Sequence, residues 1–91
     1  MNDPAQAVKS ALDAVKLVRR DRLHLSARDH AYVLTANVEP FIRDPQYVIG
    51  KLYKACEEYG APMRSIVWSA TSPDFADCQQ FQFVIKPLGE E

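Results

Sequence analysis

The fold is decided by residues 32–62, YVLTANVEPFIRDPQYVIGKLYKACEEYGAP. At its start, Tyr32, Leu34, Ala36 and Val38 alternate with a second set of side chains, which predicts a half-buried strand that ends at Pro40. Asp44-Pro45 then marks the start of a helix, because Asp caps free amides and Pro is tolerated in the first turn. The core-facing arc of this helix consists of Val48, Ile49, Leu52, Tyr53, Ala55, Cys56 and Tyr59. Gly60 and Pro62 end the helix.

The same start signal occurs at Asp3-Pro4. An apolar stripe with helical spacing follows it, formed by Val8, Ala11, Leu12, Val15 and Val18. The stripe predicts a first helix that either ends near Arg20 or projects past the core, with Leu17 on its exposed side. Residues 21–30 have no strong period, and we interpret them as an extended connector.

Residues 64–71 and 80–86 have the composition of strands. Between them, Ser72-Pro73 indicates a single turn of helix capped by Ser72. Residues 88–91 are expected to form a frayed tail.

These elements predict an α+β fold, a two-layer αβαββ sandwich that occupies residues 1–91 as a single domain. The crossover through the second helix makes its two strands parallel, and the very apolar third strand is expected between them. The result is a three-stranded mixed sheet of order 1-3-2 with both helices on one face. The other face should be uncovered and carry Thr35, Asn37, Gln80, Gln82 and Val84. Because bare edges and faces attract other chains, we expect a homodimer.

The composition excludes several classes of protein. The chain has 91 residues, with 11 basic and 12 acidic side chains, so it is not a strongly basic nucleic-acid protein. The absence of a secretion signal and of a ~20-residue apolar span argues against export and against the membrane. Its two cysteines indicate no disulfide framework, and we expect a cytoplasmic protein with free thiols.

The residues that could carry chemistry do not form a catalytic constellation. His24, His30, Cys56 and Cys78 lack the spacing of a metal site or of a nucleophile with its base. Cys56 lies within an apolar arc, whereas Cys78 is the thiol that could be exposed. We therefore expect no enzymatic activity, no cofactor and no metal.

A basic cluster offers one functional hypothesis. Residues 1–30 contain six basic and four acidic side chains, and the remainder five and eight. Arg19, Arg20, Arg22 and Arg28 could line a phosphate track in a nucleic-acid-binding regulator, or they could be solvated charges near a helix end.

The hypothesis that we favour is a small non-catalytic domain that binds a larger protein as an adaptor, regulator or inhibitor, a type of protein common among mobile-element products. Aromatic and arginine side chains at exposed positions are the usual anchors of such interfaces. The predicted contact residues are Phe75, Asp74, Asp77, Tyr47, Phe41 and Arg43.

Overall fold

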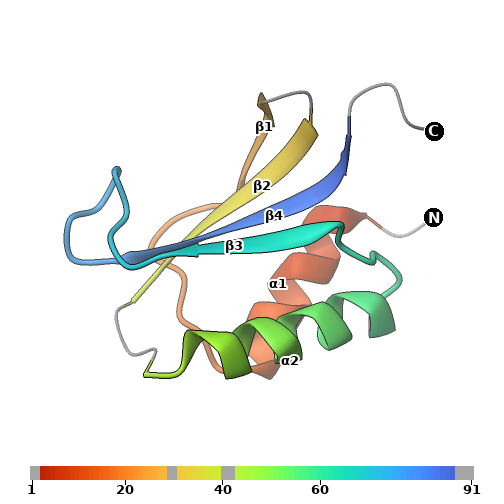
Figure 1. Ribbon diagram of the computed structural model, residues 1–91, viewed down its shortest axis with the longest axis horizontal. Coiled ribbons are helices and arrows are strands. Elements are labelled where there is room, and N and C mark those ends of the chain that lie inside the picture. Colours follow the sequence, from red (N-terminus) through yellow and green to blue (C-terminus); the bar gives the residue numbers. More distant parts are fainter. Residues whose placement is uncertain (1–2, 29–30, 40–42, 88–91) are drawn as a thin grey trace.

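Two helices lie against one face of a four-stranded sheet (Figure 1). The computed structural model describes residues 3–28, 31–39 and 43–87. The elements, in chain order, are α1 (Pro4–Ala14), β1 (His24–Arg28), β2 (Ala31–Val38), α2 (Pro45–Glu58), β3 (Ser65–Ser69) and β4 (Gln79–Pro87). The predicted α+β class is confirmed.

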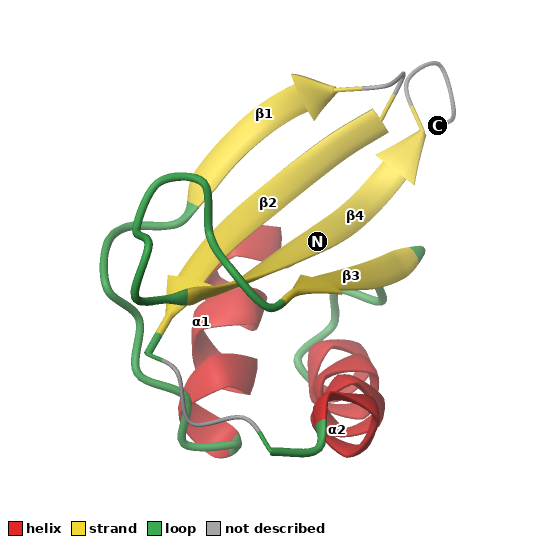
Figure 2. Ribbon diagram, turned by 60° about the vertical axis from the view of Figure 1, so that its left-hand side comes forward, coloured by secondary structure: helices red, strands yellow, loops and turns green. Residues whose placement is uncertain are grey.

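The order of the strands is β1-β2-β4-β3, and every neighbouring pair is antiparallel (Figure 2). The three predicted strands, β2, β3 and β4, follow the predicted order, with β4 between β2 and β3. The strand count was wrong, however, because residues 24–28 of the expected connector form an additional strand beside β2. The sheet is also antiparallel rather than mixed, since the parallel strands β2 and β3 never pair directly.

The helices begin as predicted. The Asp3 side chain accepts a hydrogen bond from the Ala5 amide at 3.0 Å, and the Asp44 side chain accepts one from the Tyr47 amide at 3.2 Å. Both carboxylates thereby satisfy an amide that has no partner within its helix.

The two helices end in the same motif. At α2, the Gly60 amide donates to Glu57 and the Ala61 amide donates to Cys56, with Gly60 at a φ of 84°. At α1, the Lys16 amide donates to Asp13 and the Leu17 amide donates to Leu12, with Lys16 at a φ of 62°. This is the Schellman arrangement, whose left-handed residue stops a helix.

The prediction that α1 reaches Arg20 was therefore wrong, because the chain turns at Lys16. The same turn folds Leu17 against the core, so the prediction that Leu17 is exposed was also wrong.

The core lies between the helices and the sheet. The largest fully buried side chains include Phe81 and Phe83 of β4, Leu34 of β2, Leu12 of α1 and Leu52 of α2. Residues that pair across neighbouring strands point to the same face of the sheet. The residues that alternate with Leu34, Phe81 and Phe83 along their strands therefore point to the opposite, outer face.

This outer face is less open than the sequence predicts. Thr35, Asn37 and Gln80 are buried there, whereas Gln82 and Val84 are only partly exposed. Residues 70–78, which connect β3 to β4, rise over this side of the sheet (Figure 2). Much of the outer face is consequently covered, whereas the edges formed by β1 and β3 each lack a neighbouring strand.

Candidate interaction surface

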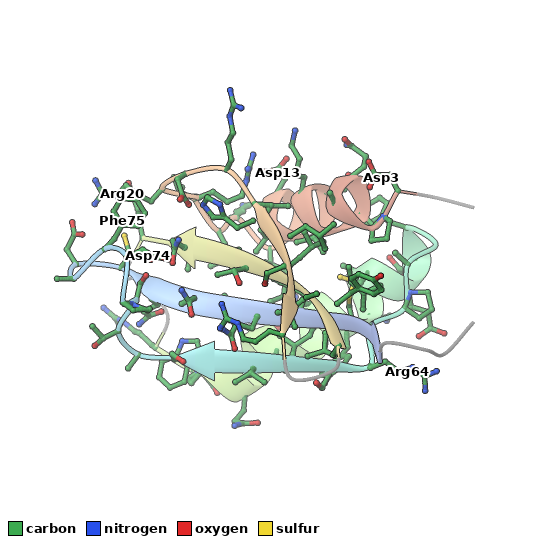
Figure 3. All side chains as sticks on the ribbon, turned by 90° about the horizontal axis from the view of Figure 1, so that it is seen from above. Asp3, Asp13, Arg20, Arg64, Asp74 and Phe75 are labelled. Atoms are coloured by element: carbon green, nitrogen blue, oxygen red, sulfur yellow. The ribbon has the colours of Figure 1, made fainter. Side chains whose placement is uncertain are left out.

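The predicted contact residues come from two segments. Asp74, Phe75 and Asp77 lie in the β3–β4 loop; Asp74 and Asp77 are exposed and Phe75 is half-buried (Figure 3). Tyr47 is exposed on the first turn of α2, where the ammonium of Lys51 lies 5.0 Å from the centre of its ring. Arg43 is exposed just before that helix, and Phe41 lies outside the described residues.

Side-chain hydrogen bonds hold the β3–β4 loop. The Ser72 hydroxyl accepts from the amides of Asp74 and Phe75 at 3.1 and 3.3 Å, and the Cys78 amide donates to the Phe75 carbonyl at 2.9 Å. Ser72 therefore caps this loop as predicted, but the turns that follow do not form the expected helix.

The loop is joined to the sheet through Asn37, which is fully buried on the outer face. The Oδ1 atom of Asn37 accepts from the Ser72 hydroxyl at 2.6 Å and from the side-chain Nε2 atom of Gln80 at 3.0 Å. Its Nδ2 atom donates to Asp21 at 3.3 Å. A buried polar side chain must be satisfied in this way, because its water has been removed.

Part of the basic cluster is neutralised by this same region. Arg20 forms an ion pair with Asp77 of the loop, at 2.5 Å. Hydrogen bonding to Cys78 and the charge of Asp77 raise the pKa of Arg20, which keeps its guanidinium charged. Next to Arg20, the Oδ2 atom of Asp21 lies 2.7 Å from the Nε2 atom of His24.

The predicted nucleic-acid residues are only partly brought together. Arg19, Arg20 and Arg22 line an open groove of about 470 Å³ beside the end of α1. Arg28 lies at the other end of β1, so roughly 20 Å of extended chain separates it from Arg22.

The outer edge of β1 is the surface that the sequence analysis missed. β1 is the first strand of the sheet, and its residues are exposed except Ser26, which is half-buried. Leu25 is 64 % exposed although it is opposite the buried Leu34. The signal was present in the sequence, because Leu23, Leu25 and Ala27 alternate with polar residues as a strand requires.

An apolar groove of about 140 Å³ lies next to this edge. It is lined by Pro4 and Ala5 of α1, by Leu23, Leu25 and Leu34, and by Ile85 of β4, with Asp3 at its polar rim. The carboxylate of Asp3 is engaged as the cap of α1. The groove and the edge of β1 form one continuous surface, which we call the β1 edge surface and define by Leu23–Arg28 with Pro4, Ala5 and Ile85.

Of the candidate catalytic side chains that the structure describes, both cysteines are buried and His24 contacts Asp21. Cys56 is buried in the core, and this burial raises the pKa of its thiol to about 11. Cys78 is also buried, so the expectation that it could be exposed was wrong; its sulfur lies 3.7 Å from Asp77 Oδ1. His30 lies outside the described residues.

Among residues 3–28, 31–39 and 43–87, no group of three or more histidine, cysteine or acidic side chains is placed to hold a metal ion. Neither of the two described helices is long and apolar enough to cross a bilayer. Comparisons with protein-family models, with curated proteins and with solved structures gave no match for this chain.

Proposed function

We propose that this protein is a non-catalytic interaction domain, an adaptor, regulator or inhibitor that binds a larger protein through the β1 edge surface. The observation that carries the proposal is the exposure of Leu25 on an open sheet edge, directly beside an apolar groove. Natural proteins usually protect such an edge, since its free amides and carbonyls accept a further strand. An extended segment of a partner would satisfy these groups and cover the groove.

Site-directed photo-crosslinking in the native host tests this proposal. A benzoylphenylalanine in place of Leu25 should cross-link one partner protein in high yield. The matched control places the same side chain at Gln46, which is exposed on α2. The proposal fails if position 25 gives no adduct, or if both positions capture the same proteins.

One observation favours nucleic-acid binding as a second candidate, namely the groove lined by Arg19, Arg20 and Arg22. Two features weigh against it: Arg20 is paired with Asp77, and Phe81 and Phe83 are buried instead of forming a stacking platform. Titration with DNA and RNA at two salt concentrations distinguishes the two functions. Nucleic-acid binding requires an affinity that falls with salt and a smaller salt slope when the three arginines are changed to Ala.

We also propose that two copies of the chain pair through the opposite edge of the sheet. β3 carries no charged residue, and its central side chain, Val67, is 47 % exposed. An antiparallel pair centred on Val67 places Ile66 opposite Trp68 and Ser65 opposite Ser69, which are all compatible neighbours.

Light scattering across a dilution series checks this pairing. The wild type should have twice the chain mass of 10.3 kDa, and Val67→Lys should be a monomer with an unchanged circular dichroism spectrum. Thr71→Lys, an exposed position beyond the strand, is the control and should remain a dimer. A wild-type chain that stays monomeric at high micromolar concentration contradicts the proposal.

A further inference from the structure

Assuming the proposed function, we infer that the segment bound at β1 is an extended acidic peptide in which carboxylate and apolar side chains alternate. The inference rests on what each side of the β1 edge surface offers to an added strand. Side chains of neighbouring strands that lie opposite each other share a face, so the two faces of β1 define two sets of partner positions.

The apolar positions follow from the helix side of β1. Leu25 and Ala27 lie on the same face as Leu34 and Tyr32, their partners on β2. The groove between Leu23, Ile85 and the first turn of α1 continues this face. Partner residues opposite Leu25 and Ala27 therefore have to be apolar, because they cover exposed apolar surface.

The acidic positions follow from the outer side. His24, Ser26 and Arg28 alternate along this face, and Arg22 precedes them. Asp21 already contacts the His24 ring, and Asp77 neutralises Arg20. Arg22 and Arg28 are both exposed, and neither faces a carboxylate in the ion pairs of the described residues. A carboxylate beside each of them would supply the complementary charge.

The same charges argue against a second copy at this edge. Antiparallel self-pairing centred on Ser26 would place His24 of each copy opposite Arg28 of the other. A second copy would thus offer Arg28 an imidazole instead of the carboxylate that complements its charge. A nucleic acid would satisfy the arginines but neither the backbone groups of the edge nor the apolar groove.

The test uses a fluorescent synthetic peptide in which Glu and Val alternate, titrated against the full chain by anisotropy. It should bind and should protect the amides of residues 24–28 from hydrogen exchange. The same peptide with Lys in place of Glu should not bind. A copy with every amide N-methylated should also fail, because it cannot extend the sheet.

Variants of the protein make the test specific to β1. Arg28→Glu should weaken the binding of the Glu peptide about tenfold or more and allow the Lys peptide to bind, because the charge reversal replaces an attraction between opposed side chains by a repulsion. Arg43→Glu, the same change at an exposed arginine outside the sheet, should leave both affinities within about twofold. Binding of the Lys peptide to Arg28→Glu also shows that this variant is folded.

Several outcomes overturn the inference. The inference fails if the Glu peptide does not bind the wild type, or if it binds Arg28→Glu as tightly as the wild type. It also fails if the N-methylated peptide binds as tightly as the unmodified one, or if the wild type binds an oligouridylate and not the peptide. Protection of residues 24–28 that rises with protein concentration alone would show a second copy at the edge and would also overturn it. A cross-linked partner whose bound segment is not acidic would overturn the inference but leave the proposed function intact.

Discussion

Asn37 is the residue on which the position of the β3–β4 loop depends. It is fully buried, and it is bonded to Ser72, Gln80 and Asp21. Asn37→Ala should lower the free energy of unfolding by about 2–4 kcal/mol, because it leaves the Ser72 hydroxyl and the side-chain amide of Gln80 buried without their acceptor. Urea denaturation measures this loss.

The control for this prediction is Gln46→Ala, an exposed amide on α2, which should change the free energy of unfolding by less than about 0.5 kcal/mol. If Asn37→Ala costs no more than the control, then the network contributes nothing to stability.

Cys56 makes stability depend on pH in the alkaline range. In the unfolded chain its thiol ionises near its ordinary pKa of 9.0, whereas in the folded protein burial holds the pKa at about 11. The contribution of Cys56 is thus complete below pH 9 and is lost as the pH rises toward 11, since unfolding then releases a proton. The free energy of unfolding of the wild type should fall over this range more steeply than that of Cys56→Ala. Parallel slopes for the two proteins would contradict the assignment.

At the residue level, the sequence was informative where periodicity decided the environment. Cys56 lies within a continuous apolar arc, and its burial was predicted correctly. The burial of Cys78 and Asn37 was not predictable in this way, because the β3–β4 loop folds back over the sheet and removes both from water. That contact joins residues 35 positions apart in the chain, as in the bond from Ser72 to Asn37, and no local pattern reports it.

Among the elements, the helix ends allow a matched pair of substitutions. Gly60 and Lys16 occupy equivalent left-handed positions after α2 and α1. Gly60→Ala should destabilise the protein by about 1 kcal/mol, because a side chain strains this conformation, and Lys16→Gly should stabilise it by up to about 1 kcal/mol for the same reason. Thermal or urea unfolding measures both changes.

Gly50 provides the internal control for these substitutions. It lies inside α2, and a Cβ atom at this position would meet nothing within 4 Å. Gly50→Ala should therefore stabilise the protein by about 0.5–1 kcal/mol, the opposite sign to Gly60→Ala. The same sign at both glycines would mean that backbone conformation does not govern these positions.

Capping residues and apolar spacing were sufficient to predict the two helices, the strands β2, β3 and β4, and the order of these three strands. They failed at Lys16 and at β1 for different physical reasons. Lysine has no intrinsic preference for a positive φ, so the end of α1 was invisible in the sequence. β1 was overlooked because it has only five residues, and its alternating apolar and polar side chains are too few to distinguish a strand from an extended connector.

Across the whole molecule, stability should be distributed unevenly over the sheet. β4 lies between two strands and carries Phe81 and Phe83 into the core, whereas β1 pairs on one side with β2 and contributes exposed side chains. Amides of residues 24–28 should therefore exchange with solvent through local opening, much faster than those of residues 80–84. Hydrogen exchange followed by mass spectrometry checks this. Equal protection of both strands would show that β1 opens only when the whole protein unfolds.

The position of the first turn of α1 has a consequence for any fusion to this protein. Pro4 and Ala5 line the groove beside Leu25, so a polypeptide joined ahead of Asp3 emerges next to the proposed peptide site. Tethering through a short flexible linker gives a local concentration in the millimolar range, at which even a feeble ligand stays bound. An acidic strand fused there should act as a built-in competitor, and the fused protein would then no longer respond to free peptide.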